Sequence, residues 1–166
     1  MATIETRKRQ IESVFTSHKS ILDSSARIEF KKGTGKNVNV VFIPRPIDFD
    51  NPREGLPLRD GVGYLSIKEE LDNEGKVMGY LYRFTSDDFE YIAAKKSSGA
   101  DNDWLGFFNF HYQKDRQHDE PHVSFLHSSM RYISREIDLN EFLNFIERTF
   151  FTNGSRNNSS PWHSRF

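Results

Sequence analysis

Apolar residues recur at helical spacing near both ends of the chain. Residues 3–22 carry them three or four positions apart, with charged residues on the other faces, which is typical of an amphipathic helix. Near the C-terminus, Asp138 and Glu141 have the spacing of a capping box, and Ile137 and Phe142 that of a hydrophobic staple. The pattern therefore predicts an N-terminal helix and a C-terminal helix, each burying one face.

Between these segments the period of the apolar residues shortens to two, which is typical of β-strands. Residues 44–61 contain four of the six prolines, so we expect a long surface loop there. The strands expected from the alternation span residues 28–30, 38–42, 64–68, 77–84, 89–94, 104–112 and 122–126.

Helices at the two ends of a run of strands indicate an α+β fold. We expect a curved antiparallel sheet of about six to seven strands, with the N-terminal and the C-terminal helix packed on it. Residues 1–151 form a single domain in this interpretation, because the pattern contains no linker and no internal repeat. The Ser/Asn-rich residues 152–166 are expected to be a disordered tail.

Composition narrows the functions that such a fold could serve. The chain has 166 residues, 15 Phe and a formal net charge of −1, so it lacks the basic excess usual in a dedicated DNA-binding module. It has no Cys, which excludes disulfides, thiolate zinc sites and cysteine nucleophiles. No stretch approaches the roughly 20 apolar residues of a membrane helix, and the N-terminus lacks the apolar run of a signal peptide. We therefore expect a cytoplasmic protein without a membrane partner.

Four of the six histidines lie close together in the sequence, at His111, His118, His122 and His127. If the two strands that carry His111 and His122 pair as a hairpin, alternation places both residues on one face. Imidazole titrates near pH 6.5, so two histidines can supply a base and an acid at cellular pH. Metal-independent RNA cleavage needs such a pair, together with a cation near the phosphate.

The residues assigned to this chemistry fall into two groups. His122 is expected to act as base or acid, with His111 or His127 as its partner. The catalytic candidates are His111, His122, His127 and Arg131, with Arg131 as the phosphate-binding cation. The nucleic-acid-binding candidates are the basic residues Lys31, Lys32 and Arg116 and the aromatic residues Tyr80 and Tyr82. No cofactor is expected.

Other interpretations of the same residues remain open. His118, Asp119, His122 and His127 could together hold zinc or manganese, because neutral imidazoles and a carboxylate suit these metals. The histidines could also be solvated surface residues without a role. The alternating residues Tyr80, Tyr82 and Phe84 could also pack in the core, and would then not stack on a nucleobase.

From Gly79 to Phe150 the chain reads YLYRF, FFNFHYQ, PHVSFLH, an Arg-Tyr pair and IDLNEFLNFIE. This order resembles the TumE-type toxins of prokaryotic toxin–antitoxin systems and related small proteins, which have a Tyr-rich strand, a strand of the form PHxH, an Arg-Tyr or Arg-Phe pair and a closing helix. The resemblance covers less than half of the chain. The resemblance implies that His122 corresponds to the first histidine of the PHxH strand and Arg131 to the arginine of the following pair. It places Ser124 where the second histidine of the family pattern stands.

Three hypotheses follow for the function. The leading one is a small cytoplasmic toxin-like protein that acts as a metal-independent ribonuclease, with RNA as its partner. The second is a non-enzymatic protein-binding module, of the antitoxin, immunity or anti-defence kind, with a cognate protein partner. The third is a metal-dependent hydrolase.

Overall fold

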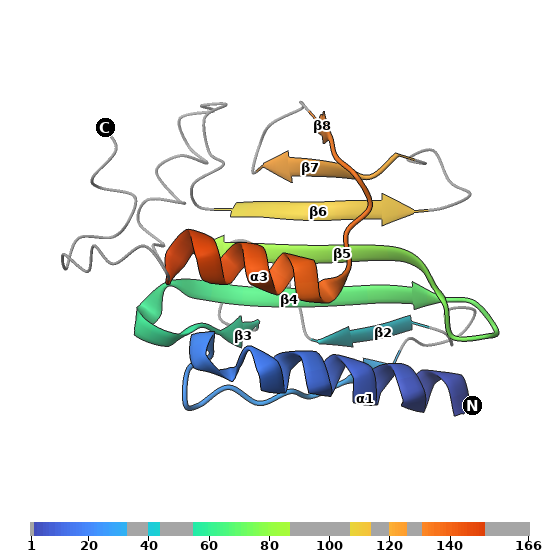
Figure 1. Ribbon diagram of the computed structural model, residues 1–166, viewed down its shortest axis with the longest axis horizontal. Helices are drawn as coiled ribbons and strands as arrows, with labels where there is room; N and C mark the ends of the chain where they lie inside the picture. Colours follow the sequence, from blue (N-terminus) through green and yellow to red (C-terminus); the bar gives the residue numbers. More distant parts are fainter. Residues whose placement is uncertain are drawn as a thin grey trace.

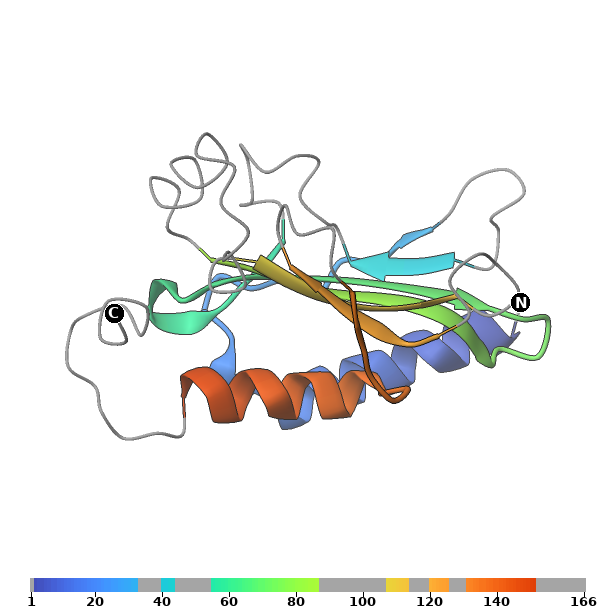
Figure 2. The same ribbon diagram turned by 90° about the horizontal axis from the view of Figure 1, so that it is seen from above.

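A computed structural model gives the fold of residues 2–32, 40–43, 55–86, 107–113, 120–125 and 131–151. In these residues two helices, α1 (Ala2–Ser17) and α3 (Leu139–Phe150), lie on one face of a twisted antiparallel sheet (Figures 1 and 2). We call the face under α1 and α3 the proximal face, and the opposite face the distal face. None of the helices in this part of the chain has the length and apolar character needed to cross a membrane.

The sheet is open and has the strand order β1-β2-β4-β5-β6-β7-β8, with the short strand β3 paired to β4 beside β2. Every pairing between these strands is antiparallel. The strands are β1 (Lys31–Lys32), β2 (Val40–Ile43), β3 (Leu56–Pro57), β4 (Gly63–Leu71), β5 (Val77–Ser86), β6 (Phe107–Gln113), β7 (His122–Phe125) and β8 (Arg131–Ile133).

The predicted α+β class, with two helices packed on an antiparallel sheet, is confirmed, but the predicted strand number is not. The described residues form eight strands, five of which have four residues or more, where six to seven were expected. Residues 28–30 are not a strand, because pairing with β2 begins at Lys31. Strands β3 and β8 are too short for alternation to reveal them. The expected strand at 89–94 and the expected tail at 152–166 lie outside the described residues.

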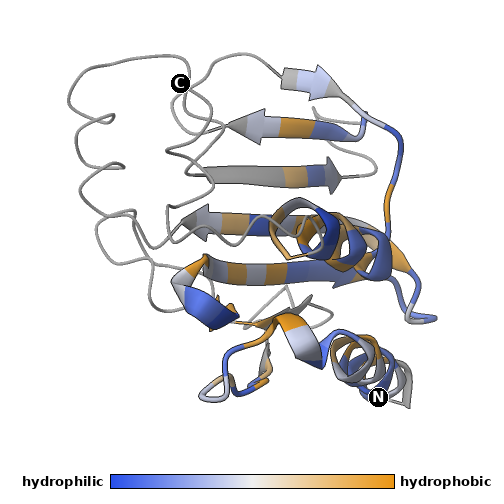
Figure 3. Cartoon of the chain, turned by 60° about the vertical axis from the view of Figure 1, so that its left-hand side comes forward, coloured by the Kyte–Doolittle hydropathy of each residue, from blue (hydrophilic) through white to orange (hydrophobic). Residues whose placement is uncertain are grey.

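The C-terminal helix begins where its capping residues predict. Asp138 accepts a hydrogen bond from the backbone N–H of Glu141 at 2.8 Å, and the Glu141 carboxylate accepts one from the backbone N–H of Asp138 at 3.0 Å. These bonds satisfy donors that a helix N-terminus leaves without a partner inside the helix, so the predicted capping box is confirmed. The apolar side of α3 turns toward the sheet (Figure 3), where it buries Leu139, Phe142, Leu143 and Ile146.

The N-terminal helix is shorter than its apolar pattern predicts. α1 ends at Ser17, and a 3-10 turn, η1 (Lys19–Ile21), continues the apolar spacing to the buried Ile21. His18 lies between α1 and η1, and its side chain contacts helix α3. Its Nδ1 lies 3.2 Å from a carboxylate oxygen of Glu147, and its Nε2 lies 3.0 Å from the side-chain oxygen of Asn140. The two helices are therefore held together by polar contacts as well as by the core.

Aromatic rings fill the space between α3 and the centre of the sheet. Tyr82 stacks on Phe142 with ring centroids 5.5 Å apart, and Phe84 stacks on Phe150 at 4.7 Å. Phe110 meets Phe142 edge to face at 5.9 Å. Offset-stacked and edge-to-face arrangements are the ones that aromatic rings prefer, so these contacts fix α3 over β5 and β6.

A buried carboxylate links α1 to the sheet. The side chain of Glu69 on β4 is 0% exposed, and it accepts hydrogen bonds from Nε and Nη2 of Arg7 at 2.6 and 2.7 Å. The Tyr82 hydroxyl donates a third hydrogen bond to Glu69, at 2.7 Å. Burial, followed by the nearby charge of Glu69, holds the pKa of Tyr82 well above its ordinary value, so this hydroxyl keeps its proton and remains a donor.

Replacing Glu69 with Gln should lower the free energy of unfolding by about 3 kcal/mol, because removing one partner of a buried ion pair leaves the other charge uncompensated. Urea unfolding followed by circular dichroism measures this change. The matched control is Glu5→Gln: Glu5 is exposed and pairs with Lys8 on the surface, so its loss should cost less than about 0.5 kcal/mol. Equal stability of the two variants would mean that the Arg7–Glu69 pair does not hold α1 on the sheet.

Candidate active site on the distal face of the sheet

Alternation along the strands separates the side chains of the two faces. Tyr82 on β5 and Phe110 on β6 contact Phe142 of α3, so the residues next to them in each strand belong to the distal face. Strand pairing then connects one continuous row of distal positions across the sheet, which we call the histidine row. It consists of Lys31, Phe42, Lys68, Leu81, His111, His122 and Ile133.

The two histidines of this row are direct neighbours. His111 on β6 and His122 on β7 are paired across the strands, and their rings meet edge to face with centroids 5.1 Å apart. His122 is 5% exposed, whereas His111 is half-buried. The predicted shared face of His111 and His122 is therefore what the register produces, and it places the two imidazoles side by side.

The ring orientation of His122 is set by the backbone. Its Nδ1 lies 3.0 Å from the carbonyl oxygen of Glu120. A carbonyl oxygen can only accept, so Nδ1 carries a proton in this contact, and in the neutral ring the lone pair is then on Nε2. The backbone carbonyl of Glu120 thus selects one tautomer of His122.

A second row of distal positions, which we call the arginine row, lies two residues away along each strand. It consists of Ser66, Arg83, Asn109, Ser124 and Arg131. Two residues of a strand span roughly 7 Å, so the two rows are adjacent. Arg131, the predicted phosphate-binding cation, is paired with Ser124 on the strand beside His122, and the structure describes its backbone only.

Formal charge is unevenly distributed over the distal face. By alternation, the described strands contribute four basic residues and one acidic residue to it, namely Lys31, Lys68, Arg83 and Arg131, and Glu70. Lys68 and Glu70 pair with each other at 2.9 Å. Among the distal positions of the described strands, basic residues therefore outnumber acidic ones although the whole chain carries a net charge of −1, and such an excess favours an anionic ligand.

The predicted stacking role of Tyr80 and Tyr82 is wrong. These side chains are 3% and 1% exposed and lie on the proximal face, where their rings stack on each other at 4.6 Å. The Tyr80 hydroxyl accepts a hydrogen bond from the backbone N–H of Ile137 at 3.1 Å, and burial raises its pKa. Neither ring has a face left for a nucleobase, because α3 occupies that side of the sheet.

The remaining predicted residues are placed only in part. Lys31 stands at the β1 end of the histidine row, whereas Lys32 pairs with Val41 and holds a proximal position, so the register separates these two lysines. His127 and Arg116 lie outside the described residues, as do His118 and Asp119 of the metal hypothesis. Within the described part of the chain, no group of three or more His, Cys, Asp or Glu residues could hold a metal ion. The metal site therefore stays a prediction.

Sequence reasoning missed Arg83, although a signal for it was present. Tyr80, Tyr82 and Phe84 alternate along β5, so Leu81 and Arg83 must belong to the other face. Once the aromatic stripe is assigned to the core, the same alternation assigns Arg83 to the face that carries His111.

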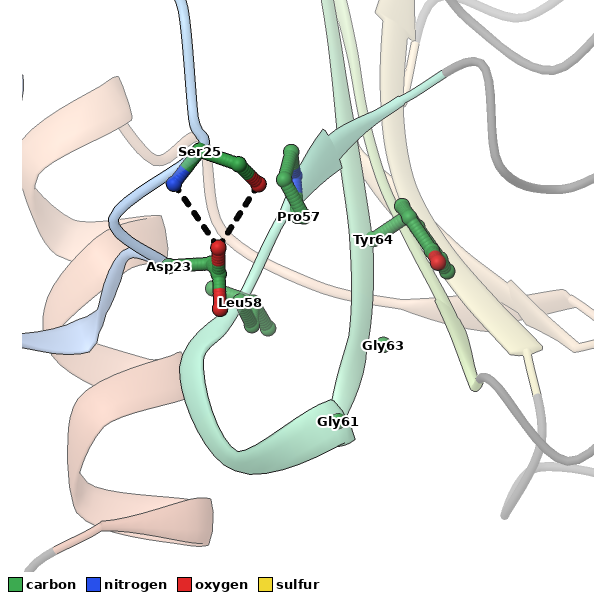
Figure 4. A pocket seen from close by; sticks show the side chains of 7 residues that line it. All are labelled: Asp23, Ser25, Pro57, Leu58, Gly61, Gly63 and Tyr64. Atoms are coloured by element: carbon green, nitrogen blue, oxygen red, sulfur yellow. Dashed lines mark hydrogen bonds between the residues drawn. The ribbon is translucent and has the colours of Figure 1, made fainter.

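A pocket of about 220 Å³ lies between the turn after η1 and the start of β4 (Figure 4). Its one carboxylate among the lining residues, Asp23, accepts hydrogen bonds from the backbone N–H and the hydroxyl of Ser25 at 2.8 and 2.6 Å, and these bonds lower its pKa. The lining residues are Asp23, Ser25, Pro57, Leu58, Gly61, Gly63 and Tyr64. Asp23 serves the local turn, and the lining brings no second acid or base to it, so the pocket offers less for catalysis than the distal face.

Comparison with known proteins finds no family model that matches this chain, and no curated protein or solved structure that resembles it. The function is therefore inferred from the histidine pair and its surroundings.

We expect neutral His122 to carry its proton on Nδ1, because this nitrogen faces the Glu120 carbonyl. A long-range proton–nitrogen NMR correlation spectrum at pH 9 distinguishes the two ring nitrogens, and the spectrum of His122→Gln assigns the signals. A proton on Nε2 would contradict the hydrogen bond and would exchange the roles of the two nitrogens.

Proposed function

We propose that this protein is a toxin-like ribonuclease that cleaves RNA without a metal ion, using His111 and His122 as its acid–base pair. The observation that carries the proposal is the cross-strand contact of the two imidazole rings, 5.1 Å apart, on a face with an excess of positive charge. General acid–base catalysis requires both groups within hydrogen-bond reach of the reacting atoms, and residues on paired strands are held at such a spacing.

The reaction assigns one step to each histidine. His122, with the lone pair of the neutral ring on Nε2, removes the proton of the ribose 2′-hydroxyl, and the 2′-oxygen attacks the adjacent phosphorus. The bond from phosphorus to the 5′-oxygen breaks, and protonated His111 donates a proton to that oxygen. The products are a 2′,3′-cyclic phosphate and a 5′-hydroxyl end, and Arg131 stabilises the negative charge that develops on the phosphoryl oxygens.

The resemblance to TumE-type toxins supports the same proposal, and the fold suggests how the departure at Ser124 is accommodated. In the family pattern the second histidine stands two residues after the first, where this chain has Ser124. Here the second imidazole comes from the neighbouring strand, at His111, which lies opposite His122 in the register.

The test is cleavage of a labelled single-stranded RNA by purified wild-type protein in the presence of EDTA. His122→Ala and His111→Ala should each lower the cleavage rate at least about 100-fold, since general acid–base groups contribute 10²–10⁴-fold. His163→Gln, which removes an imidazole far along the sequence, is the matched control and should cleave normally. The cleaved end should carry a cyclic phosphate, and a 2′-deoxy sugar at the cleaved position should block the reaction.

Loss of activity on adding EDTA would favour the metal-dependent hydrolase instead. Unchanged cleavage by both histidine variants would refute the proposed acid–base pair. Induced expression in a bacterial host adds a cellular measurement, in which growth arrest and RNA loss should accompany the wild type but not His122→Ala.

A protein-binding module is the second candidate, and one surface favours it. Beyond the edge of α3, the proximal face of β7 and β8 is not covered by either helix (Figure 1), and Tyr132 and Phe145 are 49% and 43% exposed. Phe145 contacts Phe110, which is in register with Val123 and Tyr132, so these residues form a continuous apolar strip. Exposed aromatic strips of this kind are common in protein interfaces.

This candidate predicts that the double substitution Tyr132→Ser and Phe145→Ser abolishes retention of a cognate protein during co-purification from the native host. His122→Ala should retain that partner, because it lies on the other face. A partner lost equally from both variants, or from neither, would argue against the strip as the binding surface.

A further inference from the structure

The pocket of Figure 4 is built on a short extension of the sheet. Leu22 forms an isolated antiparallel bridge with Leu58, and the backbone N–H of Asp23 donates a hydrogen bond to the carbonyl oxygen of Pro57 at 3.1 Å. Pro57 in turn pairs with Tyr64 on β4. Backbone hydrogen bonds and strand pairing therefore fix the separation between Asp23 and Tyr64, two of the residues that line the pocket.

The loop between β3 and β4 gives the pocket a fixed wall. Asp60, Gly61 and Gly63 have φ values of 60°, 66° and 155°, and the backbone N–H of Leu58 closes the loop by donating a hydrogen bond to the carbonyl oxygen of Gly63 at 2.8 Å. A Cβ at Gly63 would lie 2.3 Å from the carbonyl oxygen of Thr85, so this close approach to β5 needs glycine. A wall that is already ordered reduces the entropy lost when a ligand binds.

The polar side chains of the pocket present acceptors and one negative charge. Among the described residues that line it, Asp23 has the one charged side chain. Both hydrogen bonds from Ser25 end on Oδ1 of Asp23, and Oδ2 is turned away from Ser25 (Figure 4). The Ser25 hydroxyl uses its proton in this contact, so it can offer a ligand only its lone pairs. A ligand that complements this lining must therefore supply the positive charge and the donors.

The rest of the lining suits an apolar body next to that charge. Tyr64 contributes an aromatic ring, which can also attract a cation, and Pro57 and Leu58 contribute apolar side chains. A cavity of about 150 Å³ is large enough for benzene, so a pocket of about 220 Å³ can hold an organic molecule of roughly eight to ten non-hydrogen atoms.

We propose that this pocket binds a small organic ammonium ion, with its ammonium group on Oδ2 of Asp23 and its apolar part against Tyr64, Pro57 and Leu58. The hydrogen bonds from Ser25 lower the pKa of Asp23, so the carboxylate keeps its charge at neutral pH. Hydrogen bonds between ionised groups are stronger than those between neutral groups, so charge decides which ligands bind. The inference concerns ligand binding and is independent of the proposed RNA cleavage.

The experiment is an NMR titration of the ¹⁵N-labelled full chain at pH 7 with probes of one size and different charge. The probes are benzylamine, which is an ammonium ion at this pH, benzyl alcohol and benzoate. Benzylammonium should shift the backbone amide signals of Asp23, Ser25, Gly61 and Gly63 in a saturable way. It should bind about tenfold more tightly than benzyl alcohol, because a hydrogen bond to a charged group contributes more than a neutral one, and benzoate should leave these signals unchanged.

Asp23→Asn tests the carboxylate, because it keeps an acceptor for Ser25 and removes the charge. It should weaken the binding of benzylammonium about tenfold and leave that of benzyl alcohol unchanged. The matched control is Asp72→Asn. Asp72 accepts hydrogen bonds from the backbone N–H groups of Glu74 and Lys76 at 2.8 and 2.9 Å, so it supports a turn in the same way, but it does not line the pocket. This control should bind benzylammonium as the wild type does.

Three results would overturn the inference. They are the absence of a saturable shift at the pocket residues with benzylammonium, equal affinities for benzylammonium and benzyl alcohol, and an unchanged affinity of folded Asp23→Asn for benzylammonium. The comparison of the probes needs no variant, so it decides the question even where Asp23→Asn does not fold.

Discussion

The fold depends on a carboxylate that is completely removed from solvent. Glu69 lies in strand β4 and is compensated there by the guanidinium of Arg7 and the hydroxyl of Tyr82. A buried charge is tolerated only when its partners are in place, so β4, β5 and α1 must adopt their native positions together. The hydrogen bonds to Glu69 also raise the pKa of Arg7, which keeps its guanidinium ionised. Apolar packing alone is non-directional, whereas the hydrogen bonds between Arg7 and Glu69 fix one position of α1 on the sheet.

The two faces of the sheet carry different kinds of side chain. The proximal face holds the aromatic core, and the ion pair of Arg7 and Glu69 on it is internally compensated. The distal face receives the alternate residues of the same strands, including both paired histidines and four basic residues. Since adjacent residues of a strand must point to opposite faces, packing Tyr80, Tyr82 and Phe84 under α3 commits Arg83 to the side of His111. The candidate site is thus a consequence of how the core is packed.

The candidate site is built from regular strands, which hold side chains more rigidly than loops do. His111 and His122 come from two paired strands, the backbone carbonyl of Glu120 orients the second ring, and Arg83 and Arg131 occupy positions on the two flanking strands. Rigid placement of an acid and a base at a fixed separation is the feature on which proton transfer depends. The exposed strip of Tyr132 and Phe145 lies on the other face, so RNA cleavage and protein binding would use different surfaces.

Local sequence determined the features that depend on a few neighbouring residues. The Asp138–Glu141 capping box, the two helices and most of the long strands follow from periods of two and 3.6 and from short-range hydrogen bonds. Only the tertiary structure decided the register that sets His111 opposite His122, the burial of Tyr80 and Tyr82, and the pairing of Arg7 with Glu69, 62 residues apart in the chain. Alternation states that two residues share a face of one strand, but it does not state which face the helices cover. That choice is made by packing between distant segments, because the free energy of burying the aromatic stripe under α3 is gained only when the whole sheet is assembled.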